Sequence, residues 1–343
     1  RATFIENIID FCDDNGYDGV DIDWEYPDVT PDDKKNLNLL VQKLREAFVE
    51  EGKDWLITMA VPAGSWNGQW FDFTTLKNYV NWFGCMTYDY MGNWVSIAYH
   101  NSPLYPHTST DLGSVKAGIQ YINATRGVPK NQILLGIPFY GRGCNATGLF
   151  ASNTGGNVEY RYSEVAPKIG NGWNYYWDDI SEVPYLMNID MTKFISYDDT
   201  ASVRLKCEYA KERNLGGVMI WALGQDVIGN DQPLLEAVGG SMDIVSGTDE
   251  SPQRAPTSFL LLKNYPNPFN ASTVIPFYLA KGEEIHLEVF DILGRRITTL
   301  INKKKTQGWH KAYFSSAGIP SGLYFYRLQC ASFSKMIKMT ILK

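Results

Sequence analysis

The chain has 343 residues, of which 44% are hydrophobic, 14% aromatic and 20% charged. This composition is typical of a globular chain and excludes fibrous structure and wholesale disorder. No apolar run approaches the roughly 20 residues that a membrane-spanning helix needs. Residues 1–257 hold 19 Lys and Arg against 34 Asp and Glu, a balance of −15, whereas residues 258–343 hold 12 against 4, a balance of +8. The length and this division of charge predict two different domains.

The acidic part alternates short apolar runs with amphipathic segments, which is the pattern of βα units around a parallel sheet. Apolar residues with helical spacing, such as Leu37, Leu40, Leu44 and Phe48, indicate helices that pack against that sheet. The predicted strands are residues 19–25, 55–62, 82–90, 132–141 and 217–224. The predicted helices are residues 3–15, 31–50, 112–125 and 201–214.

Three further segments complete the predicted organisation. Residues 144–196 are rich in Gly, Asn, Tyr and Trp and far exceed an ordinary βα loop of about two to six residues, so we expect an α+β insertion there. Residues 241–257 are polar and contain two prolines, as expected of an exposed linker. Residues 258–343 are predicted to form a small all-β sandwich. Its predicted strands are residues 273–279, 285–291, 296–301, 310–314, 323–329 and 335–342.

Five cysteines are scattered along the chain without a CxxC pair, so we expect neither a zinc site nor a disulfide scaffold. The first residues, RATFIENIIDFCDD, are acidic and amphipathic and do not resemble a signal peptide. Any export signal is therefore expected upstream of Arg1.

The densest chemical signal is the segment DGVDIDWEYP at residues 18–27. Because side chains alternate between the two faces of a strand, Asp21, Asp23 and Glu25 are predicted to share one face. In a barrel interior, desolvation and mutual repulsion would raise at least one carboxyl pKa and favour a shared proton. A carboxylic acid that stays protonated near neutral pH is what a glycosidase uses to protonate the leaving oxygen.

A solvated acidic loop or a calcium site is the alternative interpretation of these carboxylates. Val20, Ile22 and Trp24 alternate with them and indicate a buried strand rather than a loop. The spacing of an EF-hand loop, with its glycine at the sixth position, is also absent. A catalytic role is therefore the favoured interpretation.

The segment DGVDIDWEYP resembles the DGxDxDWEYP signature of glycoside hydrolase family 18, the chitinases. Further motifs follow in the family's order: AVPAG at 60–64, MTYDY at 86–90, HNSPLY at 100–105, GIPFYGRG at 136–143, YDD at 197–199 and GGVMIWALGQD at 216–226. The resemblance covers residues 1–240 and implies a (β/α)8 TIM barrel whose fourth strand carries the acidic motif. Only five of the eight strands are found, so we expect an N-terminally truncated barrel and a fragment of a longer reading frame.

The resemblance also implies roles for individual residues. Glu25 would be the general acid and then the general base, Asp23 would orient the N-acetyl group of the substrate, and Asp21 would share a proton with Asp23. The substrate's own acetamido group would act as nucleophile, which is the substrate-assisted exception among retaining glycosidases. Tyr88 would donate a hydrogen bond to that group. The implied substrate-binding residues are Met86, Asp89, Trp94, Tyr140, Arg142 and Trp221, with Trp94 on the leaving-group side and Trp221 beneath the distorted sugar.

The basic tail resembles the C-terminal sorting domain of the type IX secretion system. The resemblance rests on NYPNPFN at 264–270, DILGR at 291–295 and GLYFYRL at 322–328. It implies a Bacteroidetes-type bacterium that secretes the protein or attaches it to the outer surface, with the secretion machinery as a partner. A carbohydrate-binding β-sandwich is the alternative, but the tail has a single tryptophan, Trp309, and no row of aromatic residues.

These observations predict a retaining, substrate-assisted and endo-acting hydrolase of chitin or chito-oligosaccharides. We expect a monomer without cofactor, metal, nucleic acid partner or membrane span. Two rival functions remain: an endo-β-N-acetylglucosaminidase that acts on N-glycans, and a non-catalytic chitin lectin. The MTYDY and YGRG motifs favour the chitinase over the first rival, and the presence of Glu25 favours it over the second.

Overall fold

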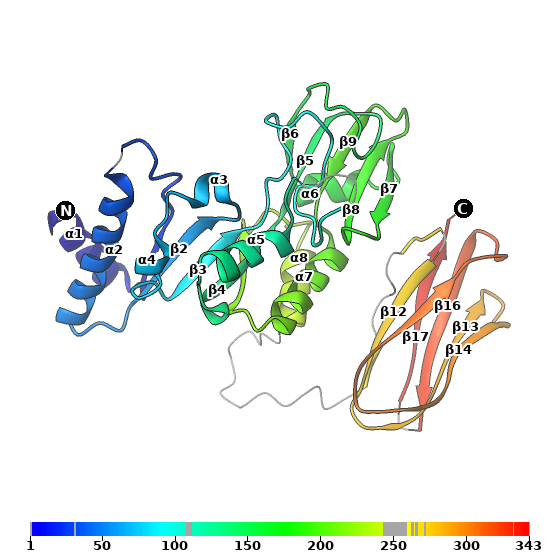
Figure 1. Cartoon of the computed structure of the whole chain (residues 1–343). Helices are drawn as coiled ribbons and strands as arrows, with labels where there is room; N and C mark the ends of the chain where they lie inside the picture. The colour runs from blue at the N-terminus through cyan, green and yellow to red at the C-terminus, as the bar shows by residue number, and fades with distance from the viewer. Residues whose placement is uncertain are drawn as a thin grey trace. The chain divides into compact units, whose positions relative to one another are not determined.

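A computed structural model describes residues 2–30, 32–107, 112–242, 259–261, 264, 267–270, 272–331 and 333–342. The chain divides into two compact units, Arg1–Val245 and Ser246–Lys343 (Figure 1), which are described separately. The predicted linker lies almost wholly outside the described residues. No helix of the part of the chain that the structure describes is long and apolar enough to cross a membrane.

The first unit is built on a parallel sheet of five strands, as predicted. The strand order is β1-β2-β3-β4-β10, so β1 and β10 form the two edges of this sheet. The strands are β1 (Gly19–Ile22), β2 (Leu56–Pro62), β3 (Trp82–Met86), β4 (Ile133–Pro138) and β10 (Gly217–Trp221). Because all five are parallel, their carboxyl ends and the loops that follow lie along one edge.

Helices pack on this sheet through apolar stripes. In α2 (Asp33–Glu50), Leu37, Val41, Leu44 and Phe48 recur with helical spacing and are all buried. On the carboxyl-terminal side of the chain, α7 (Thr200–Glu212) contacts both α8 (Pro233–Ser241) and β10. The other helices that the structure describes before β5 are α1 (Ala2–Asn15), α3 (Ser65–Gly68), α4 (Phe73–Leu76), α5 (Val115–Gln120) with the π-helical turn η1 (Tyr121–Thr125), and the 3-10 turn η2 (Lys130–Gln132).

The long interval after β4 forms a second, antiparallel sheet. Its strand order is β6-β5-β9-β8-β7. The strands are β5 (Tyr140–Asn145), β6 (Val158–Arg161), β7 (Trp173–Asp178), β8 (Val183–Asn188) and β9 (Lys193–Ser196), with α6 (Tyr162–Val165) and η3 (Ala166–Lys168) between β6 and β7. The aromatic residues of this segment pack against one another. The Tyr185 ring stacks on the rings of both Tyr176 and Phe194, and all three belong to one apolar cluster.

Four predicted strands are wrong in length. The strand predicted at 217–224 ends at Trp221, the last residue that pairs with β4. The strand predicted at 19–25 ends at Ile22, where its ladder with β2 stops, and the strand predicted at 82–90 ends at Met86. The segment predicted as one strand at 132–141 belongs to two sheets, because the chain turns at Phe139 and begins β5 at Tyr140. In all four, apolar residues continue past the last residue that has a ladder partner.

A buried ion pair joins α7 to the chain between β9 and α7. The Lys206 ammonium lies 2.6 Å from both carboxylate oxygens of Asp198 and donates to Ser102 Oγ at 2.7 Å. The side chains of Lys206 and Asp198 are fully buried. Removing one member of such a pair leaves an uncompensated charge in the protein interior.

We therefore expect Lys206→Met to lower the free energy of unfolding by about 3–5 kcal/mol, as measured by urea denaturation of the full chain. The matched control is Lys53→Met, since Lys53 pairs with Asp13 at the surface and such pairs contribute about 0–1 kcal/mol. Equal stability of the two variants would contradict this account of the buried pair.

The second unit is a β-sandwich, as predicted. One antiparallel sheet has the order β11-β12-β15 and the other the order β14-β13-β16-β17. Ile275 and Phe277 of the first sheet and Leu287, Val289 and Tyr326 of the second contribute to one core. The strands are β11 (Leu260–Leu261), β12 (Ser272–Leu279), β13 (Glu283–Asp291), β14 (Arg296–Lys305), β15 (Gly308–Ser315), β16 (Gly322–Cys330) and β17 (Phe333–Ile341). All six predicted tail strands are present, and only the short β11 was missed.

Candidate active site

The carboxyl edge of the parallel sheet carries the acidic motif. Asp21 lies on β1, and Asp23 and Glu25 follow the last residue of that strand. All three side chains are exposed, whereas Val20, Ile22 and Trp24, which alternate with them, pack on the core. The alternation predicted from the sequence is therefore present, but among the described residues the carboxylates are exposed rather than enclosed in a barrel interior. Thr58 on β2 donates a 2.5 Å hydrogen bond to Asp21.

The pKa values of two of these carboxyl groups are raised. Desolvation is the largest cause of the raised pKa of Asp23, and the charge of Asp21 adds to it. Desolvation also raises the pKa of Glu25, and so does the charge of Asp23, with which Glu25 shares a hydrogen bond. Desolvation and the charge of Glu25 together raise the pKa of Tyr26 to about 12, so its hydroxyl stays protonated beside the acid. Glu25 and Asp23 can therefore hold a proton to a higher pH than ordinary carboxyl groups do.

The loop after β3 carries Tyr88 and Asp89, while Met86 is the last residue of β3. Asp89 Oδ1 accepts two hydrogen bonds, from the Tyr140 hydroxyl at 2.6 Å and from Arg142 Nε at 2.5 Å. The Tyr88 and Tyr140 rings meet edge to face, with centroids 6.0 Å apart. The structure thus brings together residues from the loop after β3 and from β5, which the sequence placed on separate motifs.

Burial and charge set the protonation of this cluster. Desolvation and the charge of Asp89 raise the pKa of both Tyr88 and Tyr140, so each phenol stays protonated and can donate a hydrogen bond. Burial would lower the pKa of Arg142, but the hydrogen bond and the charge of Asp89 raise it. The cluster therefore presents phenol and guanidinium donors, the groups that bind sugar hydroxyl and carbonyl oxygens.

Trp94 and Trp221 are the two predicted indole surfaces, and both are more than half exposed, at 58% and 51%. Trp221 is the last residue of β10, at the carboxyl edge of the sheet. The Trp94 ring lies over Gly92, where even a Cβ atom would come within 2.4 Å of it, and the Arg142 guanidinium lies 5.0 Å from the ring centroid. Large exposed indoles at this edge can pack on the apolar faces of sugar rings.

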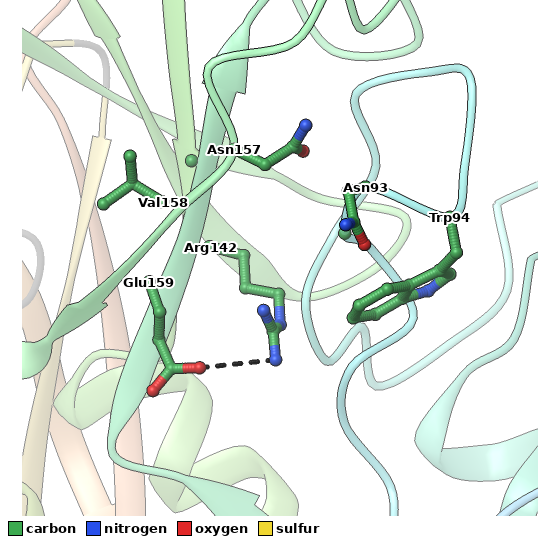
Figure 2. A pocket seen from close by; sticks show the side chains of 8 residues that line it. Asn93, Trp94, Arg142, Asn157, Val158 and Glu159 are labelled. Carbon is green, nitrogen blue, oxygen red and sulfur yellow. Dashed lines mark ion pairs between the residues drawn. The ribbon is translucent and has the colours of Figure 1, made fainter.

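A pocket with a volume of about 270 Å³ lies beside Trp94. Figure 2 shows the side chains that line it. Arg142 points into it and pairs with Glu159 of β6, with Nη2 and Oε2 3.3 Å apart. Asn93 and Asn157 line the same space. One wall of this pocket comes from the loop after β3 and the other from the antiparallel sheet.

Sequence reasoning missed several residues of this site. Glu159, Asn93 and Asn157 are isolated polar residues without a motif, so no signal distinguished them from solvated side chains. Met219 on β10 accepts a weak hydrogen bond from the Tyr88 hydroxyl, 3.8 Å away, and lies within the GGVMIWALGQD motif, which could have indicated it.

A protonatable carboxyl group, phenol and guanidinium donors and exposed indoles at the carboxyl edge of a parallel α/β sheet are together suited to cleaving a glycosidic bond. Residues 1–226 match the sequence model of the family 'Glycosyl hydrolases family 18'. The chain therefore belongs to this family. A secretion system C-terminal sorting domain matches residues 263–343.

Individual relatives agree with this assignment. Chitinase A1 of Niallia circulans is 34% identical over 312 residues, which span 80% of this chain and 44% of that protein. Chitinase ChiA of Flavobacterium johnsoniae is 30% identical over 324 residues, which span 67% of this chain and 20% of that protein. The chain thus spans less than half the length of either relative. The structure of a family 18 N-acetylglucosaminidase from Paenibacillus barengoltzii is similar, with a TM-score of 0.64 at 32% identity over 69% of this chain and 74% of that chain.

Proposed function

We propose that the protein is a chitinase that hydrolyses β-1,4-N-acetylglucosamine linkages with retention of configuration. The observation that carries the proposal is the pairing of Glu25 with Asp23, both with raised pKa values, at the same sheet edge as Tyr88 and two exposed indoles. Membership of family 18 and the similarity to Chitinase A1 support the substrate class.

In the proposed reaction, Glu25 donates its proton to the glycosidic oxygen while the bond between that oxygen and the anomeric carbon breaks. The carbonyl oxygen of the substrate's 2-acetamido group attacks the anomeric carbon and forms an oxazolinium ion. Water then attacks the same carbon, Glu25 accepts a proton from it, and the acetamido group is restored. Two displacements retain the configuration, and the enzyme supplies no nucleophile.

Asp23 would orient the acetamido group and stabilise the positive charge of the oxazolinium ion, which is close to it in the proposed complex. Asp21 would share the proton that leaves Asp23 when this charge develops. Tyr88 would donate a hydrogen bond to the same acetamido group. Its raised pKa supports this role, because only the protonated phenol can donate.

The remaining residues of the site would bind the sugars on either side of the scissile bond. Met86 and Asp89 would line the acetamido subsite, and Tyr140 and Arg142 would hold sugar hydroxyl and carbonyl oxygens. Trp221 would lie beneath the distorted sugar. Trp94 would stack on the sugar on the leaving-group side, next to the pocket that contains Asn157 and Glu159.

We further propose that residues 1–240 form the catalytic domain, with an insertion at 144–196, and that residues 241–257 link it to a sorting domain at 258–343. The protein would act as a monomer, secreted or attached to the outer surface through the type IX machinery. The match of residues 263–343 to a sorting domain and the Flavobacterium relative support this localisation. Deleting residues 258–343 should abolish export and leave chitin affinity unchanged, and lost affinity would instead favour a carbohydrate-binding tail.

The full chain should release a coloured phenol from a chitobiose glycoside, which tests the proposed activity directly. A protein that binds chito-oligosaccharides but releases no phenol would be the lectin, and one that releases glycans from an N-glycoprotein but leaves the chitobiose glycoside intact would be the endo-β-N-acetylglucosaminidase. Either result would replace the proposal.

Trp94→Ala should weaken chito-oligosaccharide binding about tenfold, since an aromatic stacking contact contributes up to about 1.5 kcal/mol. Because Trp94 is exposed, the thermal midpoint should stay unchanged. Titration of intrinsic fluorescence measures the affinity. Trp82→Ala, at the amino end of β3, is the control that should bind as the wild type does, and an unchanged affinity in Trp94→Ala would remove Trp94 from the site.

A further inference from the structure

Residues 100–102, which we call the anchor segment, lie between β3 and α5 and are completely buried. Each of its three polar side chains reaches a different part of the unit. His100 Nε2 lies 3.0 Å from Asp178 Oδ2 of β7. Ser102 donates to the Thr87 carbonyl at 2.6 Å and accepts from Lys206 of α7. The anchor segment therefore ties the loop after β3 to both the antiparallel sheet and α7.

Asn101, at the centre of the anchor segment, contacts two of the candidate site residues. Its Oδ1 accepts a hydrogen bond from the backbone N–H of Asp89 at 3.2 Å, and its Nδ2 donates to the carbonyl oxygen of Tyr140 at 3.3 Å. Its backbone N–H donates to Ser196 Oγ at 2.9 Å, and its carbonyl oxygen accepts from the Tyr90 N–H at 3.1 Å. Asn101 is thus fixed from the antiparallel sheet and bridges the backbones of Asp89 and Tyr140.

The backbone of Asp89 needs such support. Its φ angle is 63°, in the left-handed region that is unfavourable for a residue other than glycine. In this conformation its Oδ1 accepts hydrogen bonds from both the Tyr140 hydroxyl and the Arg142 Nε. If Asp89 relaxed to an ordinary conformation, its carboxylate would move away from both donors.

We propose that Asn101 is a positioning residue of the active site. It touches no substrate; instead its carboxamide holds Asp89 in the left-handed conformation and holds Tyr140 beside it, so that the cluster of Asp89, Tyr140 and Arg142 has its binding geometry before substrate arrives. This inference rests on the proposed function, because it assigns Asn101 to the site that binds the sugar. A displacement of about 1 Å in such a cluster can cost a factor of about 100 in rate.

Asn101→Ala in the full chain should lower kcat on the chitobiose glycoside about 100-fold, with a much smaller change in KM. Asn101→Asp retains the shape and the acceptor for the Asp89 N–H, and burial beside Asp89 keeps its carboxyl group protonated, so that it can still donate to the Tyr140 carbonyl. We therefore expect a smaller fall, of about tenfold. The gradation between the two variants shows that the hydrogen bonds of this side chain, and not its volume alone, carry the effect. The Asp variant also tests the proposal alone if the Ala variant does not fold.

The matched control is Asn81→Ala. Asn81 Oδ1 also accepts a backbone N–H across the sheet, from Ile57 at 2.9 Å, but at the amino end of β3, opposite the site. This variant should lose stability in urea and retain kcat per folded molecule. Wild-type kcat in folded Asn101 variants, or an equal loss in Asn81→Ala, would overturn the positioning role. A wild-type chain that neither cleaves the glycoside nor binds chitotriose would overturn the proposed function and this inference with it.

Discussion

Glu25→Gln should reduce kcat on a chitobiose glycoside by about 100-fold to 10,000-fold, which is the contribution expected of a general acid. Glutamine has nearly the same shape as the protonated acid but has no proton to give to the leaving oxygen. Binding should therefore persist, and fluorescence titration with chitotriose should give an affinity within a few-fold of the wild type. The combination of lost turnover and retained binding is specific to an acid catalyst.

The control for this substitution is Glu46→Gln. Glu46 lies on the outer face of α2 and pairs with Lys43, far along the chain from the acidic motif. It should leave kcat unchanged. An active Glu25→Gln variant would refute the proposed mechanism, whereas loss of both binding and turnover would mean that Glu25 supports the structure of the site.

Asp23→Asn should both slow the reaction, by about 100-fold, and move its pH dependence. Activity requires protonated Glu25, so the rate falls as the pH rises through the raised pKa of that group. The charge of Asp23 and its hydrogen bond with Glu25 both raise this pKa. Removing the charge should therefore lower the pKa of Glu25 and shift the alkaline limb of the profile to lower pH.

The profile of kcat/KM against pH measures this shift, since it reports the ionisations of the free enzyme. Asp54→Asn is the control, because Asp54 is exposed before the amino end of β2 and should change neither the rate nor the profile. A slower Asp23→Asn variant with an unmoved alkaline limb would mean that Asp23 acts on the substrate alone and that its charge does not control Glu25.

Local patterns in the sequence predicted much of the fold. The alternation of Asp21, Asp23 and Glu25 with apolar residues is present as predicted, because it depends only on the pleat of an extended chain. The five parallel strands and the six tail strands follow from apolar runs between turn residues, which are equally local. Both families were indicated by motifs whose residues are contiguous in the chain.

The ends of the strands could not be predicted in this way. The sequence from Gly19 to Glu25 reads as one strand, yet its ladder with β2 ends at Ile22. The apolar run around Phe139 also predicts one strand. In the structure the backbone N–H of Phe139 donates a hydrogen bond to the carbonyl oxygen of Trp221, and the chain enters the antiparallel sheet at the next residue. A strand ends where its partner ends, and the partner is a distant segment.

The sequence alone indicated which residues we propose for the chemistry, because the carboxylates and aromatic residues of the candidate site occur in dense local motifs. Only the tertiary structure decided how those residues are held. Glu159 shows no local pattern, and the HNSPLY motif that contains Asn101 indicates no role for that residue. Each acquires its proposed role from a partner across the fold: Asn101 from the backbones of Asp89 and Tyr140, and Glu159 from the guanidinium of Arg142. A hydrogen-bond partner that folding brings from more than ten residues away leaves no periodic signal in the chain.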